Sequence, residues 1–273
     1  MRKSFTLIEM VFVIVILGIL SKFGAELLLK IYENYVYSNT HNRLLSNSES
    51  AVKQIANRLQ YRIKDSVITR PTLNGSIHPI GDADASGTVL EWIGIDIDGW
   101  RGSPAPTWSG FIDLEASTST SLVSPGSTLN STNLGLFFIG SNVDLNGSGF
   151  GWNGTNLTGS DADESIKVVN IAGTAISLAS GNDFGGTDVY EYYQLAEEAF
   201  AISLEGRDLY LYNGYKPWLG EQASINNRNL IMENVESFKY TAMGDILVIQ
   251  VCVSDNNITS LGRYAVCKEK VVF

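Results

Sequence analysis

An almost unbroken apolar run near the N-terminus most constrains what this chain can fold into. Residues 5–20 read FTLIEMVFVIVILGIL, and Glu9 is their single charged residue. A helix needs roughly 20 apolar residues to cross a bilayer, so the run makes a marginal span that Lys22 completes by snorkelling. A cleavable secretory signal fits less well, because no small-x-small cleavage site follows Leu20.

The apolar pattern continues beyond this run as a stripe. Residues 30–69 carry apolar side chains largely three or four positions apart, as an amphipathic helix does. The stripe consists of Ile31, Val36, Leu44, Leu45, Val52, Ile55, Ala56, Leu59, Ile63 and Val67. No proline precedes Pro71, and Arg70, as the residue before a proline, is disfavoured in a helix. We therefore predict one helix from Phe5 to about residue 68, roughly 95 Å long at about 1.5 Å per residue. Its second half should lie against a globular head.

The first residues resemble a known processing motif. Residues 4–9, SFTLIE, are similar to the class III signal of type IV pilins and type II secretion pseudopilins. The resemblance implies that a prepilin peptidase cuts between Ser4 and Phe5, so that residues 1–4 are a leader, and that Phe5 is then N-methylated. The residue before the cut is usually Gly in this family, and Ser4 departs from that pattern.

The resemblance also accounts for Glu9. A carboxylate inside an apolar segment costs about 2.5–3.5 kcal/mol on insertion scales and needs a partner. Cleavage would create one, the cationic amine of Phe5, and Glu9 of one subunit would meet that amine of its neighbour in a filament. The alternative is that Glu9 only reaches the headgroups of the bilayer.

The basic residues Arg2 and Lys3 favour a cytoplasmic N-terminus. The chain would then cross the inner membrane once, with residues 5–29 as the transmembrane and filament-core helix. Residues 30–69 would form the amphipathic helix, and residues 70–273 a periplasmic head.

The sequence pattern of the head is typical of an antiparallel β domain, since short β-prone runs alternate with loops rich in Gly, Ser, Thr and Asn. The expected strands are Val89–Ile97, Phe111–Leu114, Leu134–Ile139, Ile166–Ile171, Val189–Leu195, Ala199–Leu204, Leu209–Tyr212, Phe238–Ala242, Ile246–Ser254 and Tyr264–Val272. Turn formers dominate residues 115–165, which we expect to be a variable, loop-rich insert. The predicted fold class is α+β, a long N-terminal helix packed on a mainly antiparallel β head. From residue 189 onward the strand order resembles the C-terminal sheet of larger minor pilins and J-type minor pseudopilins.

Two cysteines, Cys252 and Cys267, lie in the last two expected strands. In an oxidising compartment such a pair forms one disulfide, and in the cytosol two thiols. The pilin resemblance places the head outside the cytosol, so a disulfide is expected. Two buried thiols are the alternative.

Charge and motifs bear on the function class. The formal net charge of −10 leaves no basic surface for phosphates, so nucleic acid is not expected as a direct partner. The two histidines, His41 and His78, are far apart, and the sequence has no catalytic triad, zinc-ligand spacing or phosphate loop. An enzyme is therefore not expected.

Short acidic clusters are weak candidates for calcium binding. Asp82 and Asp84 match the opening of an EF-hand loop, but its twelfth position is Ile93, where the loop needs a bidentate Glu. Asp96 and Asp98 form a similar cluster. Turn chemistry is the simpler interpretation, because Asp, Asn and Gly are what tight turns require. No cofactor is therefore expected.

Four tryptophans fall among loop-forming residues: Trp92, Trp100, Trp108 and Trp152. Aromatic side chains on loops can bind carbohydrate or surface partners. They more often fill small cores under long loops, which is the interpretation we favour.

The sequence thus favours a minor pilin or pseudopilin, a structural subunit of a type IV pilus-like or type II secretion filament that assembles through its N-terminal helix. Its large head makes the filament tip a candidate position, because bulky heads would crowd one another along a shaft. The implied partners are the prepilin peptidase, other pilin or pseudopilin subunits and the inner-membrane assembly platform. The alternative is a signal-anchored periplasmic binding protein or adhesin that does not polymerise.

Overall fold

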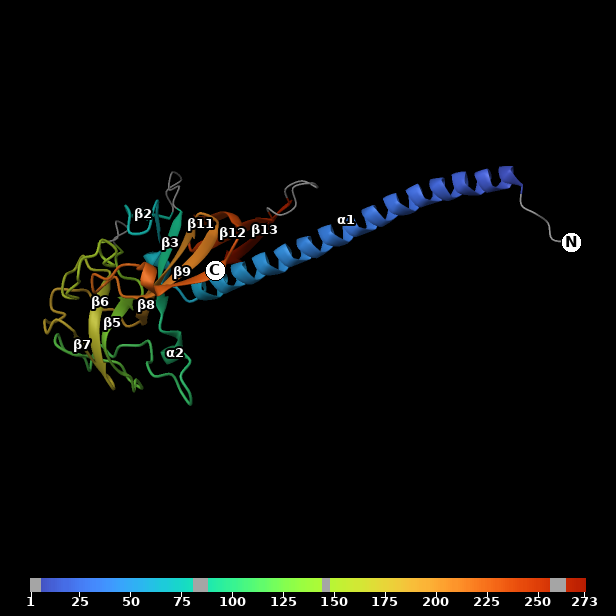
Figure 1. Cartoon of the computed structure of the whole chain (residues 1–273). Coiled ribbons are helices and arrows are strands. Elements are labelled where there is room, and N and C mark those ends of the chain that lie inside the picture. The colour runs from blue at the N-terminus through green and yellow to red at the C-terminus, as the bar shows by residue number, and fades with distance from the viewer. Residues whose placement is uncertain (1–5, 81–87, 144–147, 256–263) are drawn as a thin grey trace.

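The long helix expected from the sequence is present as α1 (Leu7–Leu59). It belongs to a computed structural model that describes residues 6–80, 88–143, 148–255 and 264–273. The first part of α1 projects away from the rest of the chain, and its last part lies along the strands of the head (Figure 1). The fold class is α+β, as predicted.

The head-facing side of α1 is an apolar stripe. Its buried residues recur three or four apart, so they fall on one face of the helix. They are Leu44, Ser48, Ala51, Val52, Ile55, Ala56 and Leu59. This face packs mainly on β12 (Ile246–Asp255) and β13 (Tyr264–Val272). The prediction that the second half of the helix lies against the head is therefore confirmed.

The predicted end of the helix, near residue 68, is wrong. After Leu59 the backbone joins the end of β3 (Val89–Ile95): Ile63 donates from N to the Ile93 carbonyl at 2.9 Å, and Ile95 donates to the Tyr61 carbonyl at 2.8 Å. A short 3-10 turn, η1 (Lys64–Ser66), and the strand β1 (Ile68–Arg70) follow. Ile63 is fully buried, as the apolar spacing predicts. It is buried, however, in a segment that pairs with the end of β3 and not in a helix.

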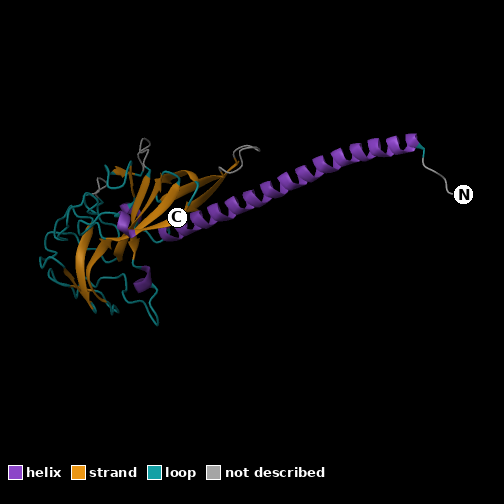
Figure 2. Ribbon diagram, viewed as in Figure 1, coloured by secondary structure: helices purple, strands orange, loops and turns teal. Residues whose placement is uncertain are grey.

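Within the described residues the strands of the head form a ten-stranded and a three-stranded sheet, both antiparallel (Figure 2). The large sheet has the order β2-β1-β3-β8-β5-β6-β7-β4, and β9 and β10 extend it beside β8. Bounds not yet given are β2 (His78–Pro79), β4 (Leu122–Val123), β5 (Asn130–Phe138), β6 (Ile166–Ala172), β7 (Ala175–Leu178), β8 (Tyr193–Glu205), β9 (Asp208–Tyr215) and β10 (Arg228–Met232). The small sheet is β11 (Val235–Met243), β12 and β13. Short helical turns are α2 (Ile97–Trp100) and η2 (Ile225–Asn227).

The long strand β8 organises the large sheet. It pairs with β3 along one edge and, along the other, with β5 at its start and β9 at its end. Residues 130–138, inside the range expected to be a variable insert, are thus the central strand β5, and that expectation needs correcting. The expected strand Leu134–Ile139 matches the buried half of β5, whereas the first residues of the strand are mostly exposed Asn, Ser and Thr, which the sequence pattern assigned to a loop. Residues 111–114, expected to be a strand, make only isolated bridges.

The tryptophans mostly fill the core. Trp92, Trp108 and Trp152 are buried, whereas Trp100 is 45% exposed. Trp92 packs in the cluster that joins α1 to both sheets, and Trp152 fills a second cluster on the large sheet. Core filling is therefore the role of three of the four residues.

A disulfide joins Cys252 of β12 to Cys267 of β13, and the two residues lie directly opposite each other in register. We expect the double variant Cys252→Ser/Cys267→Ser to lose about 3 kcal/mol of unfolding free energy, the chain-entropy value for a loop of about 15 residues. Urea unfolding of the full chain in mild detergent measures this loss. An unchanged midpoint would mean that the strand pairing alone restrains the two strands.

Candidate functional site

The projecting part of α1, residues 7–43, is called the arm below. Every residue from 6 to 35 is exposed, although the first half of this segment is apolar. So large an apolar surface marks a membrane or protein interaction site. In the part of the chain that the structure describes, α1 is the one helix long and apolar enough to cross a membrane.

The arm begins with a hydrogen-bonded turn around Glu9. Thr6 is the N-cap of α1, and Oε2 of Glu9 accepts from its backbone N at 3.0 Å and its Oγ1 at 2.9 Å. A carboxylate in the first turn also offsets the positive end of the helix dipole. The spacing Thr6-x-x-Glu9 is that of a capping box. The sequence therefore indicated Thr6 as a partner of Glu9, but the prediction for Glu9 considered only a neighbouring subunit or the lipid headgroups.

The proposed processing site lies just before this turn. Ser4 and Phe5 are outside the described residues, so the cleavage point and the amine that would face Glu9 stay predictions. Glu9 itself is exposed in the first turn of α1.

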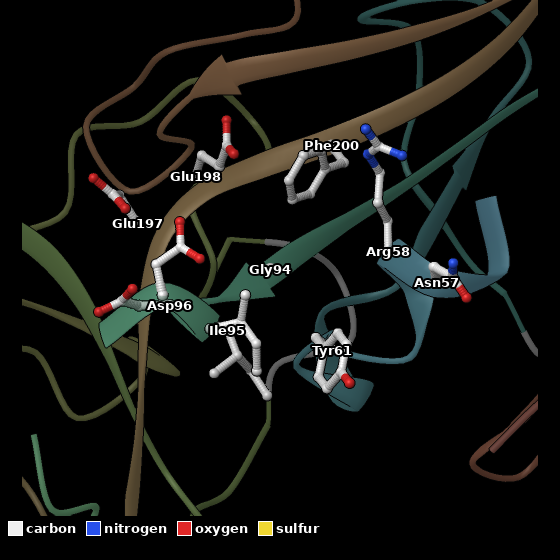
Figure 3. A pocket seen from close by; sticks show the side chains of 11 residues that line it. Asn57, Arg58, Tyr61, Gly94, Ile95, Asp96, Glu197, Glu198 and Phe200 are labelled. Carbon is white, nitrogen blue, oxygen red and sulfur yellow. The ribbon is translucent and has the colours of Figure 1, made fainter. Parts of the chain in front are cut away.

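Asp96 and Asp98 lie beside a pocket of about 300 Å³ in the head. Figure 3 shows Asp96 with Glu197 and Glu198 on one side of this pocket and Arg58 on the other. The carboxylate of Asp96 is engaged: Oδ1 accepts from Gly99 N at 2.8 Å and Oδ2 from Trp108 Nε1 at 3.1 Å.

Three other carboxylates bear on the calcium question. Glu198 Oε2 accepts from the backbone N of Gly214 at 2.8 Å. Asp82 and Asp84, the first candidates from the sequence, are outside the described residues. Across the described ranges no three His, Cys, Asp or Glu side chains gather in a group that could hold a metal ion. The structure thus gives Asp96 a structural role, as the cap of α2.

Replacing Asp96 by alanine should therefore destabilise the head by about 2 kcal/mol, since α2 loses its cap and the buried Trp108 indole loses its acceptor. Asp98→Ala is the matched control: its side chain is exposed, and we expect a change within about 0.5 kcal/mol. Unfolding in urea with calcium or with a chelator measures both. A calcium-dependent gain in the wild type that both variants abolish would instead make these residues ligands.

Comparison with known proteins adds one finding. Residues 1–21 match the family model described as the prokaryotic N-terminal methylation motif. No curated protein and no solved structure matched the chain. The chain therefore carries the N-terminal processing motif of pilins and pseudopilins at the start of an apolar helix, which fits a single-pass, membrane-anchored protein.

Proposed function

We propose that this protein is a minor pilin or pseudopilin, processed by prepilin peptidase and assembled through the arm into a type IV pilus-like or type II secretion filament. One observation carries the proposal: the methylation motif stands at the start of an arm whose residues 6–35 are all exposed. A helix of this kind needs other apolar helices or lipid around it. A filament core supplies the first and the inner membrane the second.

The proposed topology puts the N-terminus in the cytoplasm and the head in the periplasm. The disulfide between β12 and β13 supports it, because disulfides persist in oxidising compartments. The inner-membrane assembly platform and the other filament subunits would be the partners. We place the subunit at the filament tip, since a head of two sheets would crowd its neighbours if repeated along a shaft.

Mass spectrometry of the mature N-terminus tests the proposal. In cells that have the peptidase, we expect a chain that begins at N-methylated Phe5, and in cells without it the full-length chain. Ser4→Gly should be cleaved at least as completely, because it restores the residue usual in this family. A Met1 or Arg2 terminus in the presence of the peptidase would overturn the proposal.

Filament shearing separates the proposal from a subunit that is processed but does not polymerise. We expect the protein in sheared filaments together with other pilin-like subunits. Recovery of methylated chain from the membrane fraction alone would favour the non-polymerising binding protein or adhesin.

A further inference from the structure

The exposed aromatic side chains of the head gather in one place. Among the described residues after Leu59, four Phe, Trp or Tyr side chains are exposed, and three of them line a single pocket of about 620 Å³. These three are Trp100, Phe111 and Tyr192, which are 45%, 38% and 58% exposed; the fourth is Phe273. Apolar side chains that cluster on a surface mark an interaction site, and small-ligand pockets measure about 300–1,000 Å³. We call this hollow the aromatic pocket.

The wall of the aromatic pocket is fixed by the core behind it. Trp108 and Tyr193 line it, are each 2% exposed, and have ring centroids 5.7 Å apart. The Trp108 indole donates to Asp96, and the Tyr193 hydroxyl lies 2.7 Å from Ser124 Oγ. Trp100 packs on Trp108, with 4.8 Å between ring centroids. The pocket is therefore preformed, which lowers the entropic cost of binding a ligand.

A glycine keeps the space beside Trp100 open. Gly110 lines the pocket with φ at +72°, a conformation that favours glycine, and a Cβ there would lie 3.2 Å from Trp100 Cζ3. Phe111 follows it and forms an isolated bridge with Tyr192, so that the two rings meet edge to face at 6.1 Å. The exposed rings thus border a hollow that no side chain of Gly110 fills.

One cation lines the aromatic pocket. Arg101 is the single charged residue among the described residues that line it. Its guanidinium donates to the Tyr61 hydroxyl and lies 4.9 Å from the centroid of the Tyr61 ring. Across the described residues no ion pair neutralises it, and Asp98, three positions earlier, lines the neighbouring pocket instead. A guanidinium that is held in place without a counter-charge suits a carboxylate on a ligand.

Two polar groups of the pocket are also available to a ligand. The side-chain amide of Gln194 and the indole N–H of Trp100 make no hydrogen bond to any described residue. The amide can both donate and accept, and the indole can donate. These groups can therefore bind hydroxyls of a ligand whose apolar face lies on the aromatic rings.

We propose that the aromatic pocket binds an acidic saccharide, in which a pyranose unit carries a carboxylate. The C–H groups on one face of the pyranose ring pack on the exposed aromatic rings, and its hydroxyls bind Gln194 and the Trp100 indole. The carboxylate pairs with Arg101, which a purely apolar ligand would leave without a counter-charge.

This inference goes beyond the proposed function and does not depend on filament assembly. No residue that lines the aromatic pocket belongs to α1 or to the small sheet. Figure 1 shows α2, which contributes Trp100, on the side of the head away from the small sheet. The contacts proposed for the arm therefore leave the pocket uncovered.

Binding of the full chain, in mild detergent, to a panel of immobilised glycans tests the proposal. Each glycan carries a uronic or sialic acid, and its matched partner is the carboxyl-reduced form, with an alcohol in place of the carboxylate. We expect binding to at least one acidic glycan and about tenfold weaker binding to its reduced form, because a charge-assisted hydrogen bond becomes a neutral one. No binding to the panel, or equal binding of the two forms, would overturn the proposal.

The variant Arg101→Gln tests where the carboxylate binds. Glutamine keeps a donor near the Tyr61 hydroxyl and removes the charge, so affinity for the acidic form should fall about tenfold and affinity for the reduced form should not change. Arg58→Gln is the matched control, because Arg58 is exposed and lines only the neighbouring pocket. If Arg101→Gln kept the preference for the acidic form, the carboxylate would bind elsewhere and the proposal would be wrong.

Two further variants test the aromatic rings. Trp100→Ala and Tyr192→Ala should each weaken binding of both glycan forms about tenfold, whereas Phe273→Ala, at an exposed ring outside the pocket, should not. Urea unfolding checks that the variants fold, and exposed Tyr192 should be replaced with little change in the midpoint. Undiminished binding by folded Tyr192→Ala and Trp100→Ala would refute the pocket as the binding site.

A neighbouring subunit is the other occupant to test. Both native cysteines are in the disulfide, so Tyr192→Cys introduces a single thiol, which should react with a maleimide equally in the free chain and in sheared filaments. Protection in filaments would assign the pocket to a subunit contact and overturn the saccharide proposal, while the proposed function would stand. Loss of glycan binding likewise leaves filament incorporation unchanged, so the two proposals fail separately.

Discussion

The variant Glu9→Val is expected in the membrane, cleaved before Phe5 and methylated, but absent from sheared filaments. Removing the carboxylate makes insertion easier by about 2.5–3.5 kcal/mol on insertion scales. In the proposed filament it would also leave the Phe5 amine of a neighbouring subunit without its counter-charge, and loss of one partner from a desolvated pair costs about 3–5 kcal/mol. Immunoblots of sheared filaments and of membranes, each normalised to total protein, measure the partition.

Two controls separate the proposed assembly role of Glu9 from its capping role. Thr6→Val removes the hydroxyl that donates to Glu9 Oε2 and keeps the charge, so it should cost about 1 kcal/mol of helix stability and leave incorporation near the wild-type level. Glu9→Gln keeps a side-chain oxygen for the Thr6 backbone N and removes the charge, so it should fail as Glu9→Val does. If Thr6→Val abolished incorporation and Glu9→Gln did not, the carboxylate would act through the start of α1 and not through a neighbour.

The spacing of apolar residues predicted those parts of the fold that are set by neighbouring residues in the chain. The buried face of α1 follows the three- and four-residue spacing, and the expected strands Ala199–Leu204 and Leu209–Tyr212 lie within β8 and β9, which pair with each other. The end of α1 could not be predicted from spacing, because Leu59 and Ile63 are four positions apart and both buried although the helix ends at Leu59. That boundary is set by hydrogen bonds to β3, a contact between distant parts of the chain.

The same difference between local and long-range contacts separates Glu9 from β5 and Arg70. Glu9 could be singled out from residues 4–9 alone, because a charge in an apolar run is a local anomaly. The central place of β5 could not, since pairing with β8 and β6 is a property of the whole sheet. The sequence also offered Arg70 only as the residue before a proline, and the structure gives it a much larger role.

Arg70 forms a buried ion pair with Glu91. Its Nε lies 3.2 Å from Glu91 Oε2, and the two side chains are 3% and 2% exposed. The guanidinium also donates to the carbonyls of Gly75 and Trp152, so it ties β1 to the segment that follows it and to a loop distant in the sequence. Burial raises the pKa of Glu91, and the charge of Arg70 opposes that rise.

Replacing Arg70 by methionine should therefore cost about 3–5 kcal/mol of unfolding free energy, because it leaves the Glu91 carboxylate buried without a counter-charge. Urea unfolding of the full chain in mild detergent measures the loss. Arg228→Met is the matched control: Arg228 pairs with Glu205 at 2.6 Å, but these side chains are 33% and 36% exposed, and such pairs contribute at most about 1 kcal/mol.

The pH dependence identifies the cause of that loss. Without Arg70 the folded-state pKa of Glu91 rises further above its unfolded value, so Glu91 folds best when protonated. The deficit of Arg70→Met should then be small below the unfolded pKa, about 4.3, and should grow as the pH rises through the folded one. Arg70→Met/Glu91→Leu removes both charges and should recover much of the loss at neutral pH. A deficit that is equal at pH 4 and pH 8, and unchanged in the double variant, would trace the loss to the hydrogen bonds of Arg70 with Gly75 and Trp152 and not to the ion pair.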